Sequence, residues 1–129
     1  ECAALRARSL DLFELTGGWV TLADDAAEQR RFAEAARRHA WHAELWAERS
    51  PSIPPVDAEQ LVARHRAPSD RSGASDRTAT HLAALRSLIE QLDRLDDRSV
   101  AELDPNTVRT IMLVRADLVD LLAAGTADR

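Results

Sequence analysis

Apolar residues recur at intervals of three and four along four long stretches of the chain. This spacing places them on one side of an α-helix, and no stretch shows the strict alternation of a half-buried strand. The pattern predicts an all-α protein with helices at about 2–22, 26–49, 76–96 and 105–124, and a short extra helix at about 57–66. At 129 residues, the chain has the length of a single domain.

Capping residues and prolines predict where the helices begin and end. Asp24 or Asp25 is placed to cap the helix at 26–49, and Pro51 is expected to end it, because the residue before a proline avoids the helical region. Asp104 is the expected cap of the last helix. Pro105 is its expected first residue, where the missing N–H of proline costs nothing.

Glycines mark two further positions. We expect the last helix to end before Gly125. Gly17 and Gly18 lie inside the first helical pattern, where each disfavours helix by about 1 kcal/mol relative to alanine. Either the helix kinks or ends early there, or the missing side chains allow a neighbouring helix or a ligand to approach closely.

The spacing also predicts which residues of each helix are buried. In the first helix these are Leu5, Leu12, Phe13, Thr16, Trp19 and Val20. In the third they are Thr78, Leu82, Leu85, Leu88, Ile89, Leu92 and Leu95, and in the last Val108, Ile111, Met112, Leu118, Val119 and Leu122.

The connections between the helices predict the topology. Short links join the first helix to the second and the third to the fourth, whereas about 26 residues separate the second from the third. Two antiparallel hairpins joined by one long crossover are typical of ferritin-like bundles. The chain therefore resembles the ferritin-like superfamily over nearly its whole length, and the resemblance implies one antiparallel four-helix bundle over 1–129 with the extra helix in the crossover.

Many ferritin-like proteins hold two metal ions, using single glutamates from two helices and Glu-x-x-His motifs from the other two. No glutamate of this sequence stands three residues before a histidine. His39 and His42 occupy the corresponding place on the second helix, Glu14 matches a single glutamate, and His81 is the nearest substitute on the third helix. The resemblance thus implies a bundle without a standard di-iron centre.

His39 and His42 fall on the apolar face of the second helix, together with Phe32, Ala35, Ala36, Ala43 and Trp46, so both should point inward. Two histidines at this spacing can share one metal ion, with Glu14 or His81 as a third ligand. They can equally be neutral core residues with hydrogen-bond partners, or acid–base groups. We expect core residues and no cofactor, with iron or another transition metal as the alternative.

Arg115 falls inside the apolar stripe of the last helix. A buried guanidinium needs a carboxylate partner, and Glu14 or Asp11 of the first helix is the expected one. In the alternative interpretations, Arg115 extends to the edge of the bundle or binds a small anion.

Trp41 and Leu45 form a second apolar patch on the second helix, beside Arg37 and Arg38. We expect the crossover to fold over this patch. The alternative is a self-association surface, since tryptophan and arginine are enriched where interfaces gain most of their energy.

Composition narrows the functional classes. The net charge of −5 argues against nucleic-acid binding, and no apolar run is long enough to span a membrane. With Cys2 as its single cysteine the chain cannot form an internal disulfide, so we expect a cytoplasmic protein. All 17 cationic residues are arginine, which is typical of a GC-rich bacterial genome. The sequence has no glycine-rich phosphate-binding loop, no nucleophile elbow and no Cys/His pair at catalytic spacing. We therefore predict an assembly or partner-binding protein, active as a homodimer, with a metal-binding protein or metal-dependent oxidoreductase as the alternative.

Overall fold

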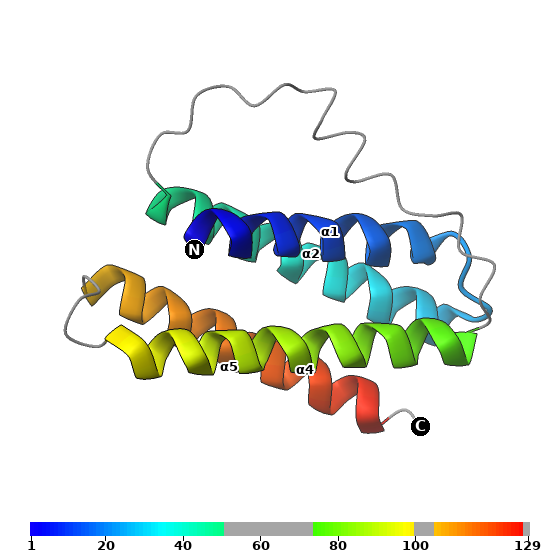
Figure 1. Cartoon of the computed structure of the whole chain (residues 1–129). Coiled ribbons are helices and arrows are strands. Elements are labelled where there is room, and N and C mark those ends of the chain that lie inside the picture. Colours follow the sequence, from blue (N-terminus) through cyan, green and yellow to red (C-terminus); the bar gives the residue numbers. More distant parts are fainter. Residues whose placement is uncertain (51–73, 100–104, 128–129) are drawn as a thin grey trace. The chain divides into compact units, whose positions relative to one another are not determined.

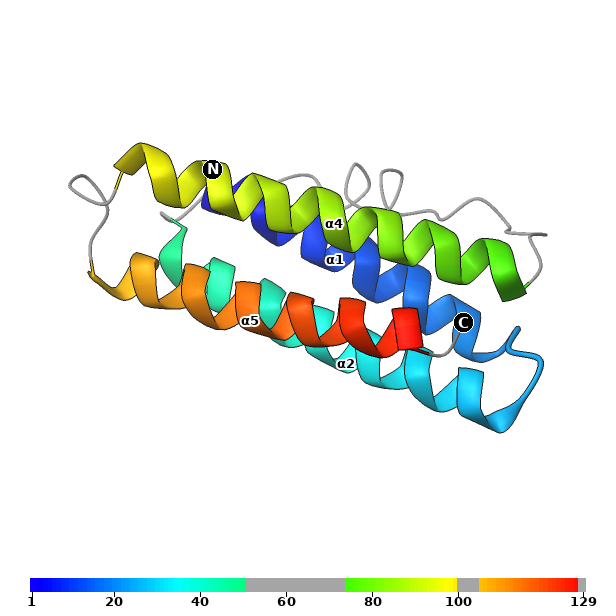
Figure 2. The same ribbon diagram turned by 90° about the horizontal axis from the view of Figure 1, so that it is seen from below.

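The computed structural model describes residues 1–50, 74–99 and 105–127. These residues form four helices and no strand, as the spacing of apolar residues predicts. The chain divides into two compact units, and each contains one pair of helices: α1 with α2, and α4 with α5 (Figure 1; Figure 2). The predicted helix at 57–66, the crossover and the cap Asp104 lie outside the described residues.

Helix α1 spans Cys2–Val20 and continues through both of its internal glycines. It ends two residues earlier than predicted, at a turn in which the Thr21 hydroxyl donates a hydrogen bond to the carbonyl of Gly18, at 3.0 Å. Its buried residues are Leu5, Ser9, Leu12, Thr16 and Trp19. Phe13 and Val20 are not among them, and Phe13 is 40% exposed.

Helix α2 spans Ala26–Arg49, as predicted, and its first turn is held by a reciprocal cap. The Asp25 carboxylate accepts a hydrogen bond from the backbone N–H of Glu28, and the Glu28 carboxylate accepts one from the N–H of Asp24, each at 2.8 Å. Together they satisfy two backbone N–H groups at the start of the helix. At the other end, Ser50 is extended, which is the conformation that the following Pro51 favours.

The first unit is an antiparallel hairpin in which α1 and α2 lie side by side in both views (Figure 1; Figure 2). Trp19 packs on Phe32 with ring centroids 5.2 Å apart. A methyl group added at Gly17 would lie 3.9 Å from the Cβ of Ala36, an ordinary contact distance. Gly17 therefore lies beside α2, in agreement with the interpretation in which a neighbouring helix approaches it closely. The packing nevertheless leaves room for an alanine there.

The second unit is the hairpin of α4, Ala74–Ser99, and α5, Pro105–Ala127. Both helices are longer than predicted. α5 continues past Gly125, and that glycine is buried against α4: a methyl group added there would lie only 2.7 Å from Leu82 Cδ2. Gly125 is thus a packing residue inside the helix and not its C-terminal cap.

Every residue of the predicted stripe on α4 is buried except Ile89, which is half-buried. The prediction for α5 was partly wrong: Ile111 and Leu118 are buried, but Met112 is 65% exposed and Val119 is 39% exposed. These two lie about 100° or more around the helix from Leu118, so one stripe cannot bury all three.

Candidate functional site

His39 and His42 lie on the buried face of α2, and both side chains are completely shielded from solvent. The same face carries Phe32 and Trp46, which are also completely buried. The spacing of seven residues between Phe32, His39 and Trp46 brings them to nearly the same side of the helix, since two turns take 7.2 residues. The prediction that both histidines point inward is therefore confirmed.

The two imidazole rings are close neighbours. Their centroids are 5.8 Å apart and their planes meet at 78°, an edge-to-face arrangement. Within the described part of the chain, the Nδ1 atom of each ring is buried without a hydrogen bond, although neither histidine as a whole is without a partner. α2 thus holds two buried histidines side by side.

Glu14 does not lie with the two histidines on a buried face, because it is exposed on α1. It follows the buried Leu12 by two residues, which turns it about 200° around the helix, to the opposite side. The expectation that Glu14 is a core group was therefore wrong. Across residues 1–50, 74–99 and 105–127, no three side chains of His, Cys, Asp or Glu gather as a metal site requires. His81 is buried on α4, in the second unit.

Arg115 is exposed, so its predicted place in the core was also wrong. Its partner is Asp93 of α4 and not Glu14: Nε donates to Asp93 Oδ1 at 2.6 Å, and a second guanidinium nitrogen donates to Oδ2 at 3.3 Å. The hydrogen bonds from Arg115 lower the pKa of Asp93, and those to Asp93 raise the pKa of Arg115. This ion pair joins the two helices of the second unit.

The outer side of α2 carries the most distinctive exposed group of the first unit. Trp41 is 43% exposed, with its ring centroid 5.9 Å from that of His42, and Leu45 beside it is half-buried. The crossover that we expected to cover them lies outside the described residues. We call Trp41, Leu45, Arg37 and Arg38 the Trp41 patch.

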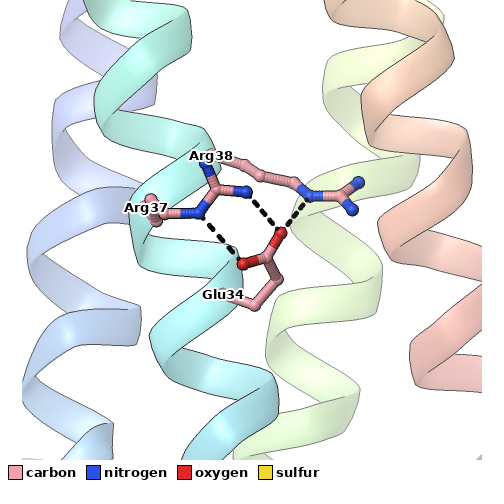
Figure 3. A network of polar contacts seen from close by, with 3 residues as sticks. All are labelled: Glu34, Arg37 and Arg38. Carbon is pink, nitrogen blue, oxygen red and sulfur yellow. Dashed lines mark hydrogen bonds and ion pairs between the residues drawn. The ribbon is translucent and has the colours of Figure 1, made fainter.

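The two arginines of the Trp41 patch are held by one carboxylate (Figure 3). Glu34 accepts two hydrogen bonds from Arg37, at 2.7 and 3.0 Å, and one from Arg38, at 2.8 Å. These contacts lower the pKa of Glu34 from 4.5 to about 2. The spacing of three and four residues along the helix brings the three side chains together.

Comparison with known proteins finds no matching family model, no similar curated protein and no similar solved structure. No helix among the described residues is both long and apolar enough to cross a membrane.

Proposed function

We propose that the protein is a non-enzymatic assembly protein that binds another protein surface through the Trp41 patch. The proposed scaffold is a ferritin-like bundle without a complete di-iron site, and the proposed setting is the cytoplasm of a bacterium. The order of the helices and the long link between α2 and α4 support the scaffold, and the single cysteine and the all-arginine cations support the setting.

The observation that carries this proposal is the exposure of Trp41 beside two arginines that are already held in place. A tryptophan has a large apolar surface, and burying it against a partner can supply a large part of the binding energy. Side chains ordered before binding lose less entropy on association, and Glu34 orders both Arg37 and Arg38. Both arginines of the Trp41 patch are therefore ordered before a partner binds.

Sedimentation equilibrium over a range of protein concentrations tests the proposal. We expect the wild type to form a dimer and Trp41→Ser to weaken it by at least about tenfold, as removal of a central aromatic contact usually does. Met112→Ser is the matched control, since it removes an apolar side chain that is 65% exposed on α5 and should leave the dimer unchanged. Equal dissociation constants for wild type and Trp41→Ser would refute the proposal.

A metal-binding protein or metal-dependent oxidoreductase is the second candidate, and it is favoured by the adjacent, buried rings of His39 and His42. Imidazole suits iron, zinc, copper and nickel, and a pair at this spacing can bind one ion. Elemental analysis of protein purified without chelator or histidine tag decides it, with His39→Ala/His42→Ala as the comparison. We expect substoichiometric metal in both proteins, because the carboxylate expected as a third ligand, Glu14, is exposed. Stoichiometric metal that the double variant lacks would establish the second candidate.

A further inference from the structure

An open groove of about 210 Å³ runs between α1 and α2 of the first unit. α1 lines it with Arg6, Leu10 and Phe13. α2 lines it with Glu44 and with three alanines, whose small side chains leave the space open: Ala40, Ala43 and Ala47. A cavity of about 150 Å³ accommodates benzene, so this groove can take a large apolar side chain.

The two walls of the groove carry opposite charges. Arg6 is exposed on the α1 wall and Glu44 is exposed on the α2 wall. Neither forms an ion pair with another residue that the structure describes. The rest of the lining is apolar and includes the side chain of Phe13, which is 40% exposed. The groove thus combines an apolar lining with one cation and one anion, and each of these two side chains can form an ion pair with another molecule.

We infer that a second copy of this chain docks on the groove, related to the first by a two-fold axis. A two-fold axis that lies in the plane of the interface, passes midway between Arg6 and Glu44 and is at right angles to the line joining them exchanges the positions of these two residues. Arg6 of each copy then faces Glu44 of the other, and the exposed parts of the two Phe13 rings are covered together. A surface with one cation and one anion placed in this way is self-complementary, which is the requirement of a two-fold interface.

The inference rests on the proposed function and names the partner for it. A stable interface buries about 800 Å² on each partner, which is more than a groove of this size provides. The contact must therefore extend along α2, and Trp41 is three residues before Glu44, on a neighbouring part of the helix surface. The groove and the Trp41 patch form one continuous interface in the dimer.

A charge exchange tests the pairing. Arg6→Glu or Glu44→Arg alone places like charges opposite each other twice in the dimer, and we expect each to raise the dissociation constant by about tenfold or more at low salt. The double variant Arg6→Glu/Glu44→Arg restores opposite charges at both contacts, and we expect a constant close to that of the wild type. The effects of the single variants should shrink at about 1 M salt, where screening is strong.

Arg8→Glu is the matched control. It makes the same change of charge on the same helix, but Arg8 is two residues from Arg6, which turns it about 200° around α1, and it does not line the groove. We expect it to shift the constant far less than Arg6→Glu does. Arg8 is half-buried, so circular dichroism of this and every other variant verifies that the helices remain folded.

The possible results separate this inference from the proposed function. A wild type that stays monomeric, or single variants that weaken the dimer without rescue by the double variant, would overturn the groove pairing. A dimer that Trp41→Ser weakens and the charge reversals leave unchanged would overturn the groove pairing alone. A dimer that follows the charge exchange and is insensitive to Trp41→Ser would support the groove and refute the role of the Trp41 patch.

Discussion

Gly125 offers the sharpest quantitative test of the helix packing. A methyl group added at this position would lie 2.7 Å from Leu82 Cδ2 and 3.7 Å from Leu82 Cγ. Leu82 is only 2% exposed, so its side chain is enclosed and has little room to move away. Gly125→Ala should therefore push α5 away from α4 or force Leu82 out of its rotamer.

Two opposing terms set the magnitude. Replacing glycine by alanine inside a helix stabilises by about 1 kcal/mol. Overpacking a filled contact costs about 1 to 3 kcal/mol. We expect Gly125→Ala to lie between neutral and about 2 kcal/mol less stable than the wild type.

Gly18 provides a matched control, because it also lies two residues before the end of its helix. A methyl group added at Gly18 meets nothing within 4 Å, so Gly18→Ala should gain the full propensity term of about 1 kcal/mol. The two variants should therefore differ by about 1 to 3 kcal/mol in the free energy of unfolding. Urea denaturation followed by circular dichroism measures both.

A double variant isolates the steric contact. Leu82→Ala alone should destabilise by about 2 to 5 kcal/mol, because it empties a buried site. In that background Gly125→Ala has space for its methyl group and should stabilise, as Gly18→Ala does. If Gly125→Ala stabilised the wild type as much as Gly18→Ala does, the close packing of Gly125 on Leu82 would be refuted.

Two ion-pair predictions follow from the pKa values. The Glu34 carboxyl has a pKa of about 2 in the folded chain, against 4.5 without its partners, so the stability that its contacts contribute is present above about pH 4.5 and is lost as the pH falls towards 2. Carbon-13 NMR titration of Glu34 should show its pKa rise towards 4.5 in Arg37→Ala/Arg38→Ala, and an unchanged pKa would contradict the assigned cause. Arg115→Ala should raise the pKa of Asp93 in the same titration, because the guanidinium holds it low. It should change the free energy of unfolding by less than about 1 kcal/mol, since both partners are exposed, and a loss of about 3 to 5 kcal/mol would instead indicate a buried pair.

The sequence predicts those features that depend on one helix alone. The face of α2 is an example, because Phe32, His39 and Trp46 are brought together by helix geometry without help from any other element. The start of α2 is another, since the bond from the Glu28 N–H to Asp25 is formed by residues three apart.

Features that depend on two helices were harder to predict. Arg115 was expected to meet Glu14 or Asp11, but it pairs with Asp93 of the adjacent helix. A signal was available, because residues at equal distances from the turn of a hairpin face each other, and Asp93 and Arg115 are equally far from position 104. Leu82 and Gly125, which also contact each other, are likewise at nearly equal distances from position 104. The position of the connection between the two helices would therefore have predicted the partner of Arg115 better than the apolar stripe does.

Met112 and Val119 show a second limit of the sequence pattern. Apolar character indicates that a residue can be buried, but much of the surface of a folded protein is also apolar. α5 carries apolar residues on more than one side, and only the packing decides which side is covered. The site residues are subject to the same limit, as the exposed Glu14 illustrates.

The unequal exposure of the three tryptophans has a practical consequence. Trp19 and Trp46 are 2% and 0% exposed, Trp41 is 43% exposed, and the chain contains no tyrosine. A collisional quencher such as acrylamide therefore reaches Trp41 well before the other two indoles, and the loss of fluorescence measures how accessible that single ring is. If a partner covers the ring, quenching weakens without any label on the protein. Trp41 is thus an intrinsic fluorescent probe of the surface through which we propose that the protein associates.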